Sequence, residues 1–150
     1  MNKIAVIILT SFCAIVPVPA QQSEQDYPID QPSVRFAPLH IYLESCNWLA
    51  AYQFELKATA GQIKIVGVEG GQHKAFKEAP YYDPAALAND RIIIAAFNTG
   101  RDLPTDRTRI ATIHLQIIGD AEPEYELKLT IAADAAGEEI PAEISFEKGE

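Results

Sequence analysis

Hydrophobic and polar residues alternate along much of the chain after residue 34. In the stretch 50–58 every second residue is apolar, with Gln53, Glu55 and Lys57 between. Successive side chains of a β-strand point to opposite faces, so a period of two predicts strands with one buried face. The predicted buried positions, over five such stretches, are Leu39, Ile41, Leu43, Ala50, Tyr52, Phe54, Leu56, Ala58, Ala111, Ile113, Leu115, Ile117, Leu127, Leu129, Ile131, Ile140, Ala142, Ile144 and Phe146.

Two further stretches, 63–69 and 91–97, are dense in apolar residues and are predicted to be strands buried on both faces. Turn residues separate the strands, and Gly137 suits the left-handed position of a hairpin. At least seven strands with turns at short spacing indicate an all-β fold, an antiparallel β-sandwich of jelly-roll type.

One short helical turn is expected near 84–88. Asp83 is a good N-cap and Pro84 is favoured at the first helical position. Four residues, 85–88, complete the turn, and Asn89 is predicted to close it in a left-handed conformation. The chain would then enter the strand 91–97.

The first 20 residues have the pattern of a secretory signal peptide. Lys3 precedes an apolar core at 4–16, and the small residues of 18–20 form a cleavage site. Residues 21–33 are polar and without period, which predicts a disordered lead before one domain at 34–148. We therefore expect a secreted protein, periplasmic or extracellular, with no membrane insertion once the signal peptide is removed.

Charge and cysteine content narrow the classes of partner. The whole chain has 12 basic and 21 acidic residues; removing Lys3 leaves 11 minus 21, a charge of −10. Such an excess repels phosphate backbones and anionic lipids, which argues against nucleic-acid or membrane-surface partners. Cys46 would remain alone, and we expect it to be buried, with an intermolecular disulfide as the alternative.

A resemblance to cohesin modules begins at "QFEL" and "VGVEGG", through Gln53, Phe54, Leu56 and the stretch 66–70. The stretches "DRIIIAAFNTG" and "TRIATIHLQIIG" resemble later strands of the same family, and together they span most of 36–147. Cohesins are secreted β-sandwiches related in fold to some carbohydrate-binding modules. The resemblance implies a non-catalytic module that binds a dockerin-like protein. Many cohesins carry Tyr-Asp-Pro directly after the first of these strands, whereas here it stands at 82–84.

The sequence lacks the local motifs of several common catalytic sites. It has no Gly-x-Ser-x-Gly, no His-Glu-x-x-His, no phosphate-binding loop and no cysteine pair for zinc. We expect no enzyme activity and no cofactor. Asp102 and Asp106, on a turn, are the candidate calcium ligands. His40 and His114 share the polar parity of their strands, so they would either meet across a ladder as metal ligands or lie separately on an outer face.

Exposed aromatic residues are the candidates for binding. Tyr81 and Tyr82 are adjacent, so in extended backbone they point to opposite sides and only one packs inward. Tyr42 and Tyr125 are further candidates, whereas Tyr52, Phe54 and Phe97 are predicted to lie in the core. Trp48 either stacks on a ligand or, as we expect, closes the end of the sandwich. The predicted function is secreted recognition of a protein through a sheet face. The alternatives are a carbohydrate-binding module, as in polysaccharide catabolism, or a structural subunit of a cell-surface assembly.

Overall fold

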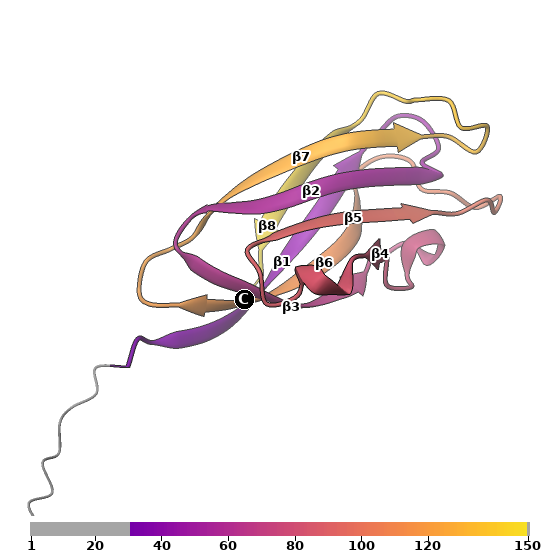
Figure 1. Cartoon of the computed structure of the whole chain (residues 1–150). Coiled ribbons are helices and arrows are strands. Elements are labelled where there is room, and N and C mark those ends of the chain that lie inside the picture. Colours follow the sequence, from indigo (N-terminus) through magenta and orange to yellow (C-terminus); the bar gives the residue numbers. More distant parts are fainter. Residues whose placement is uncertain (1–30, 150) are drawn as a thin grey trace, which may run out of the picture. The chain divides into compact units, whose positions relative to one another are not determined.

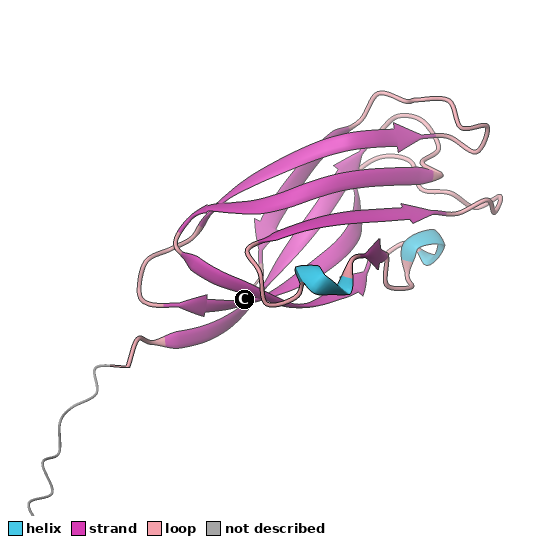
Figure 2. Ribbon diagram, viewed as in Figure 1, coloured by secondary structure: helices cyan, strands magenta, loops and turns pink. Residues whose placement is uncertain are grey.

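The computed structural model describes residues 31–149. The predicted signal peptide and most of the predicted lead lie outside these residues. The described part of the chain consists of strands joined by short loops and two 3₁₀ turns (Figures 1 and 2). Its elements are β1 (Val34–Glu44), β2 (Ala51–Ala60), β3 (Gln62–Gly70), η1 (Lys74–Phe76), β4 (Tyr81–Tyr82), η2 (Pro84–Ala86), β5 (Arg91–Phe97), β6 (Thr108–Ile118), β7 (Glu124–Ala133) and β8 (Glu143–Lys148).

The strands form two four-stranded sheets. One has the order β3-β6-β1-β8 and the other the order β4-β5-β2-β7, and every paired ladder is antiparallel. The buried side chains of both sheets form one hydrophobic core. The predicted antiparallel β-sandwich is therefore confirmed.

Strand β2 illustrates how the alternating pattern produces the core. Tyr52, Phe54 and Leu56 are fully buried, whereas Lys57 on the opposite face is exposed. The Tyr52 hydroxyl donates a hydrogen bond of 3.0 Å to the carbonyl oxygen of Ile110 in the other sheet. Burial disfavours the charged phenolate and raises the pKa of Tyr52. This side chain thus joins the two sheets through a neutral hydrogen bond.

The two sheets meet differently along their two sides. Gly61, with a φ of +81°, turns the chain from β2 in one sheet into β3 in the other. On that side, Ile65 of β3 exchanges two backbone hydrogen bonds with residues 88 and 89, the segment that follows η2. On the opposite side, the rings of Tyr125 in β7 and Phe146 in β8 meet edge to face, 5.6 Å apart.

Three predicted burial patterns are wrong. Val66 of β3 and Ile93 of β5 are exposed, so these strands are buried on one face only. Ile131 of β7 is also exposed, because the pairing with β2 passes from Phe54–Leu129 to Gln53–Ile131 and leaves Thr130 as an extra residue. Such a bulge reverses which residues face the core.

The predicted turn at 84–88 forms as the 3₁₀ helix η2. As expected, the Asp83 carboxylate caps it by accepting a hydrogen bond of 2.9 Å from the backbone N–H of Ala85. The left-handed residue is Ala88, with a φ of 66°, and not Asn89. Asn89 instead bonds back to the turn, its side-chain amide donating to the carbonyl oxygen of Ala85 and its backbone N–H to that of Ala86.

Candidate binding face

Large apolar side chains are exposed on the outer face of the β4-β5-β2-β7 sheet. Tyr81 is 70% exposed, Phe97 66%, Ile131 47% and Ile93 44%. The register aligns one residue from each strand of this sheet in a row across the four strands. The row runs from Tyr81 of β4 through Ala95 of β5 and Gln53 of β2 to Ile131 of β7. Directly paired residues of antiparallel strands point to the same face, and Ile93 and Phe97 share the parity of Ala95 on β5. The four exposed side chains Tyr81, Ile93, Phe97 and Ile131 therefore lie on one outer face, and we call them the apolar patch.

Tyr81 and Phe97 are the aromatic centre of the apolar patch. Tyr81 is paired with Ala95, which makes Phe97 its diagonal neighbour on β5. The two ring centroids are 6.1 Å apart and the ring planes differ by only 11°. Two nearly parallel rings held by neighbouring strands present a preformed aromatic surface, because each backbone is fixed by its ladder.

The other end of the same outer face is charged. The Arg91 Nε donates a hydrogen bond of 2.6 Å to Glu55 Oε1, and a second guanidinium nitrogen lies 3.2 Å from Oε2. These bonds lower the pKa of the Glu55 carboxyl, and the nearby Lys128 and Lys57 lower it further. Glu126 is paired with Lys57 in the next row. The face therefore changes from apolar to charged along its strands.

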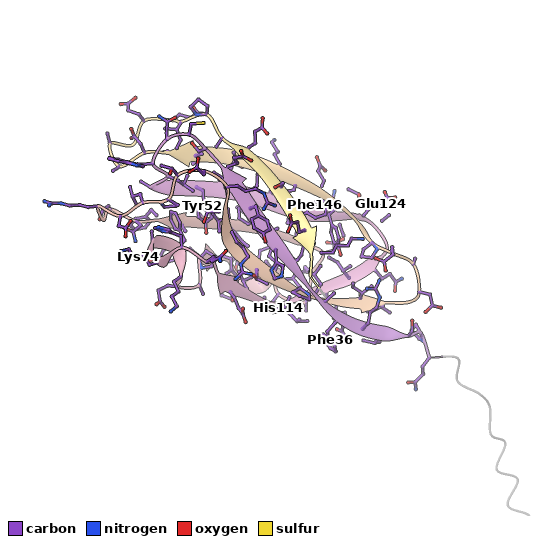
Figure 3. All side chains as sticks on the ribbon, turned by 180° about the vertical axis from the view of Figure 1, so that it is seen from behind. Phe36, Tyr52, Lys74, His114, Glu124 and Phe146 are labelled. Atoms are coloured by element: carbon purple, nitrogen blue, oxygen red, sulfur yellow. The ribbon has the colours of Figure 1, made fainter. Side chains whose placement is uncertain are left out.

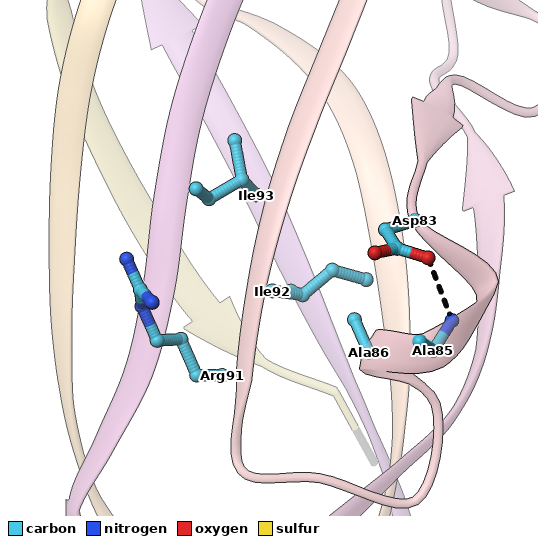
Figure 4. Close-up of a pocket in the computed structure, with 6 residues that line it drawn as sticks. All are labelled: Asp83, Ala85, Ala86, Arg91, Ile92 and Ile93. Carbon is cyan, nitrogen blue, oxygen red and sulfur yellow. Dashed lines mark hydrogen bonds between the residues drawn. The ribbon is translucent and has the colours of Figure 1, made fainter.

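A shallow depression of about 450 Å³ borders the apolar patch (Figure 4). It lies beside β5, where the two-residue strand β4 ends and η2 begins. Figure 4 shows Ile92 pointing toward Ala86, whereas Ile93 projects to the other side of β5. Its lining includes the small side chains of Ala85 and Ala86 on one side and Ile93 of the apolar patch on the other.

Of the predicted aromatic residues, only Tyr81 lies in the patch. Tyr82 is half-buried and packs against the core, so of the two adjacent tyrosines it is Tyr81 that points outward. Tyr42 lies on the other sheet, where the Arg107 guanidinium covers one face of its ring at 3.7 Å from the centroid. Tyr125 is half-buried against Phe146.

Two predictions about the loop between β1 and β2 are wrong. Trp48 is 67% exposed and does not close the end of the sandwich; Leu49, its neighbour, is the buried residue there. Cys46 is exposed and not buried, and it forms no disulfide within residues 31–149. Cys46 and Trp48 border a separate shallow depression with Asp134.

The predicted calcium ligands do not come together as a site. Asp102 forms an ion pair with Lys74, and this contact holds the pKa of its carboxyl below the usual range. Asp106 accepts a hydrogen bond of 3.3 Å from the hydroxyl of Thr105. Within the described part of the chain, no three His, Cys, Asp or Glu side chains are arranged to hold a metal ion.

The two strand histidines lie on the same outer face but have different neighbours. His40 Nδ1 is 3.1 Å from Thr112 Oγ1. His114 Nε2 is 3.1 Å from Glu69 Oε1 but has no partner in hydrogen-bond geometry. Strands β1 and β6 pair as the metal hypothesis requires, yet the register places His40 opposite Thr112. The structure therefore matches the alternative of two separate histidines on an outer face.

The sequence analysis missed Phe97, Ile93 and Ile131 as members of a surface patch. Phe97 was predicted in the core, yet it is 66% exposed on the outer face of its sheet. The three isoleucines at 92–94 show no alternation in the sequence, and only the structure shows that Ile92 and Ile94 are buried while Ile93 is exposed.

In comparisons with known proteins, no family model, no curated protein and no solved structure matched the chain. Across residues 31–149, no helix has the length and apolar character needed to cross a membrane.

Proposed function

We propose that this domain is a secreted, non-catalytic recognition module that binds a protein partner through the outer face of the β4-β5-β2-β7 sheet. The observation that carries the proposal is the apolar patch of Tyr81, Ile93, Phe97 and Ile131. Exposed patches of this kind mark interaction sites, and tyrosine is enriched among the residues that dominate binding energy. The resemblance to cohesins supports a dockerin-like partner.

The mixed character of the face supports a protein as the ligand. A protein interface usually has an apolar centre and a polar rim. Here the patch supplies the apolar part, and the charged side chains of Arg91, Glu55 and Lys128 at the other end of the face supply charges that fix orientation. The adjoining depression beside Ile93 gives a partner side chain a place to insert.

The test is retention of secreted proteins on the immobilised domain, 31–149, with matched variants. Tyr81→Ala and Phe97→Ala should each lose the retained partner, because each removes one ring of the aromatic pair. Phe36→Ala is the control, since Phe36 is also 70% exposed but lies on the other sheet (Figure 3). Equal retention by all three variants would contradict the proposal, and a partner without duplicated calcium-binding loops would exclude the dockerin version.

A carbohydrate ligand is the second candidate, favoured by the nearly parallel rings of Tyr81 and Phe97. Sugar rings stack on exposed aromatic faces, and two nearly parallel exposed rings offer such a platform. Affinity electrophoresis in gels containing soluble polysaccharides tests this directly. Retardation that is lost in Tyr81→Ala and kept in Trp48→Ala would support it, whereas no retardation in any polysaccharide would exclude it.

A further inference from the structure

Strand β7 has an open edge. It pairs with β2 on one side only, and it is the last strand of its sheet (Figure 1). Its end is covered, since the Ile140 N–H donates to the carbonyl oxygen of Ala132 and Ala133 bridges Glu139. From 124 to 131, the described residues supply no backbone partner on the far side.

The hydrogen bonds of β2 identify which backbone groups of β7 point outward. The backbone N–H of Ala58 donates to the carbonyl oxygen of Asp90 on the β5 side, so in this part of β2 the even-numbered residues bond to β5. The odd-numbered residues of β2 must then bond to β7, through its residues 126 and 128. Consequently residues 125, 127 and 129 direct their N–H and C=O groups to the open edge.

This edge lacks two of the usual protections against pairing with another strand, although it carries an exposed lysine, Lys128, and a bulge at Thr130. Natural edge strands often carry a proline or an inward-pointing charge. Between 124 and 131 there is no proline, and the inward side chains are Tyr125, Leu127 and Leu129. These three are only half-buried, as are Ile144 and Phe146 of the neighbouring strand β8. A strand added here would gain hydrogen bonds and cover apolar surface.

We propose that the open edge of β7 pairs with β7 of a second copy of this chain, antiparallel, about a two-fold axis at Leu127. Only residues 125, 127 and 129 direct backbone groups to the open edge. In a pair of β7 strands, these residues of one copy must therefore lie opposite the same set of residues in the other copy. Centring the pair on Leu127 places Glu126 of each copy opposite Lys128 of the other. The outward side chains of such pairs are close enough for opposite charges to attract.

The neighbouring registers are less favourable. A pair centred on residue 126 brings Glu124 opposite Lys128 but also places Glu126 opposite its own copy. A pair centred on residue 128 places Lys128 opposite its own copy. Like charges directly opposite each other destabilise a ladder. Of these three registers, the Leu127 register alone gives opposite-charge pairs without a like-charge pair. Because the charges of β7 complement those of β7 itself in this register, we take a second copy of the chain as the strand that pairs with the open edge.

The dimer would join two four-stranded sheets into one continuous sheet. Because the two-fold axis is perpendicular to the sheet, both apolar patches lie on the same side. A partner or polymer with repeated sites could then be held at two points, which raises apparent affinity without new contacts. The pairing itself is independent of what the patches bind.

Charge exchange at β7 tests the pairing. The mature chain should show a dimer mass in sedimentation equilibrium, and Glu126→Lys and Lys128→Glu should each weaken dimerisation at least about tenfold. In the Leu127 register, each single change places two like charges opposite each other, at position 126 of one copy and position 128 of the other. The double variant restores both pairs and should restore the dimer.

Controls separate this result from misfolding and from the binding face. Urea unfolding of each variant measures whether the domain itself is intact, because positions 126 and 128 also face Lys57 and Glu55 of β2. Tyr81→Ala should leave the dimer mass unchanged. A wild-type protein that stays monomeric up to about 100 µM, or a dimer insensitive to both single changes in folded protein, overturns the proposal.

Discussion

The exposure of Phe97 can be tested by comparing its truncation with that of Phe54. Phe54 is fully buried, so Phe54→Ala leaves a cavity and should cost about 3–5 kcal/mol of unfolding free energy. Phe97 is 66% exposed, so only a third of its surface is covered. A third of the stabilisation from burying a whole phenylalanine is about 0.5–1 kcal/mol, and loss of the contact with Tyr81 adds about 0.5 kcal/mol.

Equilibrium unfolding in urea measures both changes in one assay. The two variants remove the same group from adjacent, paired strands, β2 and β5, so differences in the unfolded state largely cancel. We expect Phe97→Ala to cost about 1–1.5 kcal/mol, roughly a third of the cost of Phe54→Ala. If Phe97→Ala costs about 3 kcal/mol or more, Phe97 belongs to the core and is not available to a partner.

Three further predictions concern the scaffold. Tyr52→Phe should lower the free energy of unfolding by about 1 kcal/mol, measured in urea, because it removes the hydrogen bond between the sheets. Gly71→Ala should cost about 1–3 kcal/mol in the same assay, since a Cβ at Gly71 would lie 2.2 Å from the backbone carbonyl oxygen of Arg109 in β6; no loss would contradict that packing. Arg91 lowers the pKa of Glu55, so its stabilising effect is present above the ordinary glutamate pKa and is lost as the pH falls through the lowered value. The difference in unfolding free energy between wild type and Arg91→Met should therefore shrink between about pH 7 and about pH 2, and a constant difference would refute the assignment.

The alternation of residue types was sufficient to predict the sandwich and most of its core. Leu39, Ile41 and Leu43 of β1 and Tyr52, Phe54 and Leu56 of β2 are all buried, as their parity requires. The cap at Asp83 was also predictable, because it depends only on residues within one turn. These features are local, and the sequence specifies them directly.

The candidate binding face depended on information that local sequence does not contain. The isoleucines of β5 resemble a strand buried on both faces, and only the tertiary arrangement shows that Ile93, on its outer side, is exposed. The bulge at Thr130 exposes Ile131 through a change of register with β2. The stacking of Tyr81 on Phe97 likewise depends on β4 pairing with β5, and a two-residue strand has no detectable period.

The central claim is that the apolar patch around Tyr81 and Phe97 is the binding face of this domain. The most direct measurement is the affinity of the retained partner for the wild type, for the Tyr81→Ala, Phe97→Ala double variant and for the Phe36→Ala control, by calorimetry. We expect the double variant to lose at least about 2 kcal/mol of binding free energy, about thirtyfold in affinity, and the control to match the wild type. Unchanged affinity in a folded double variant would contradict the claim.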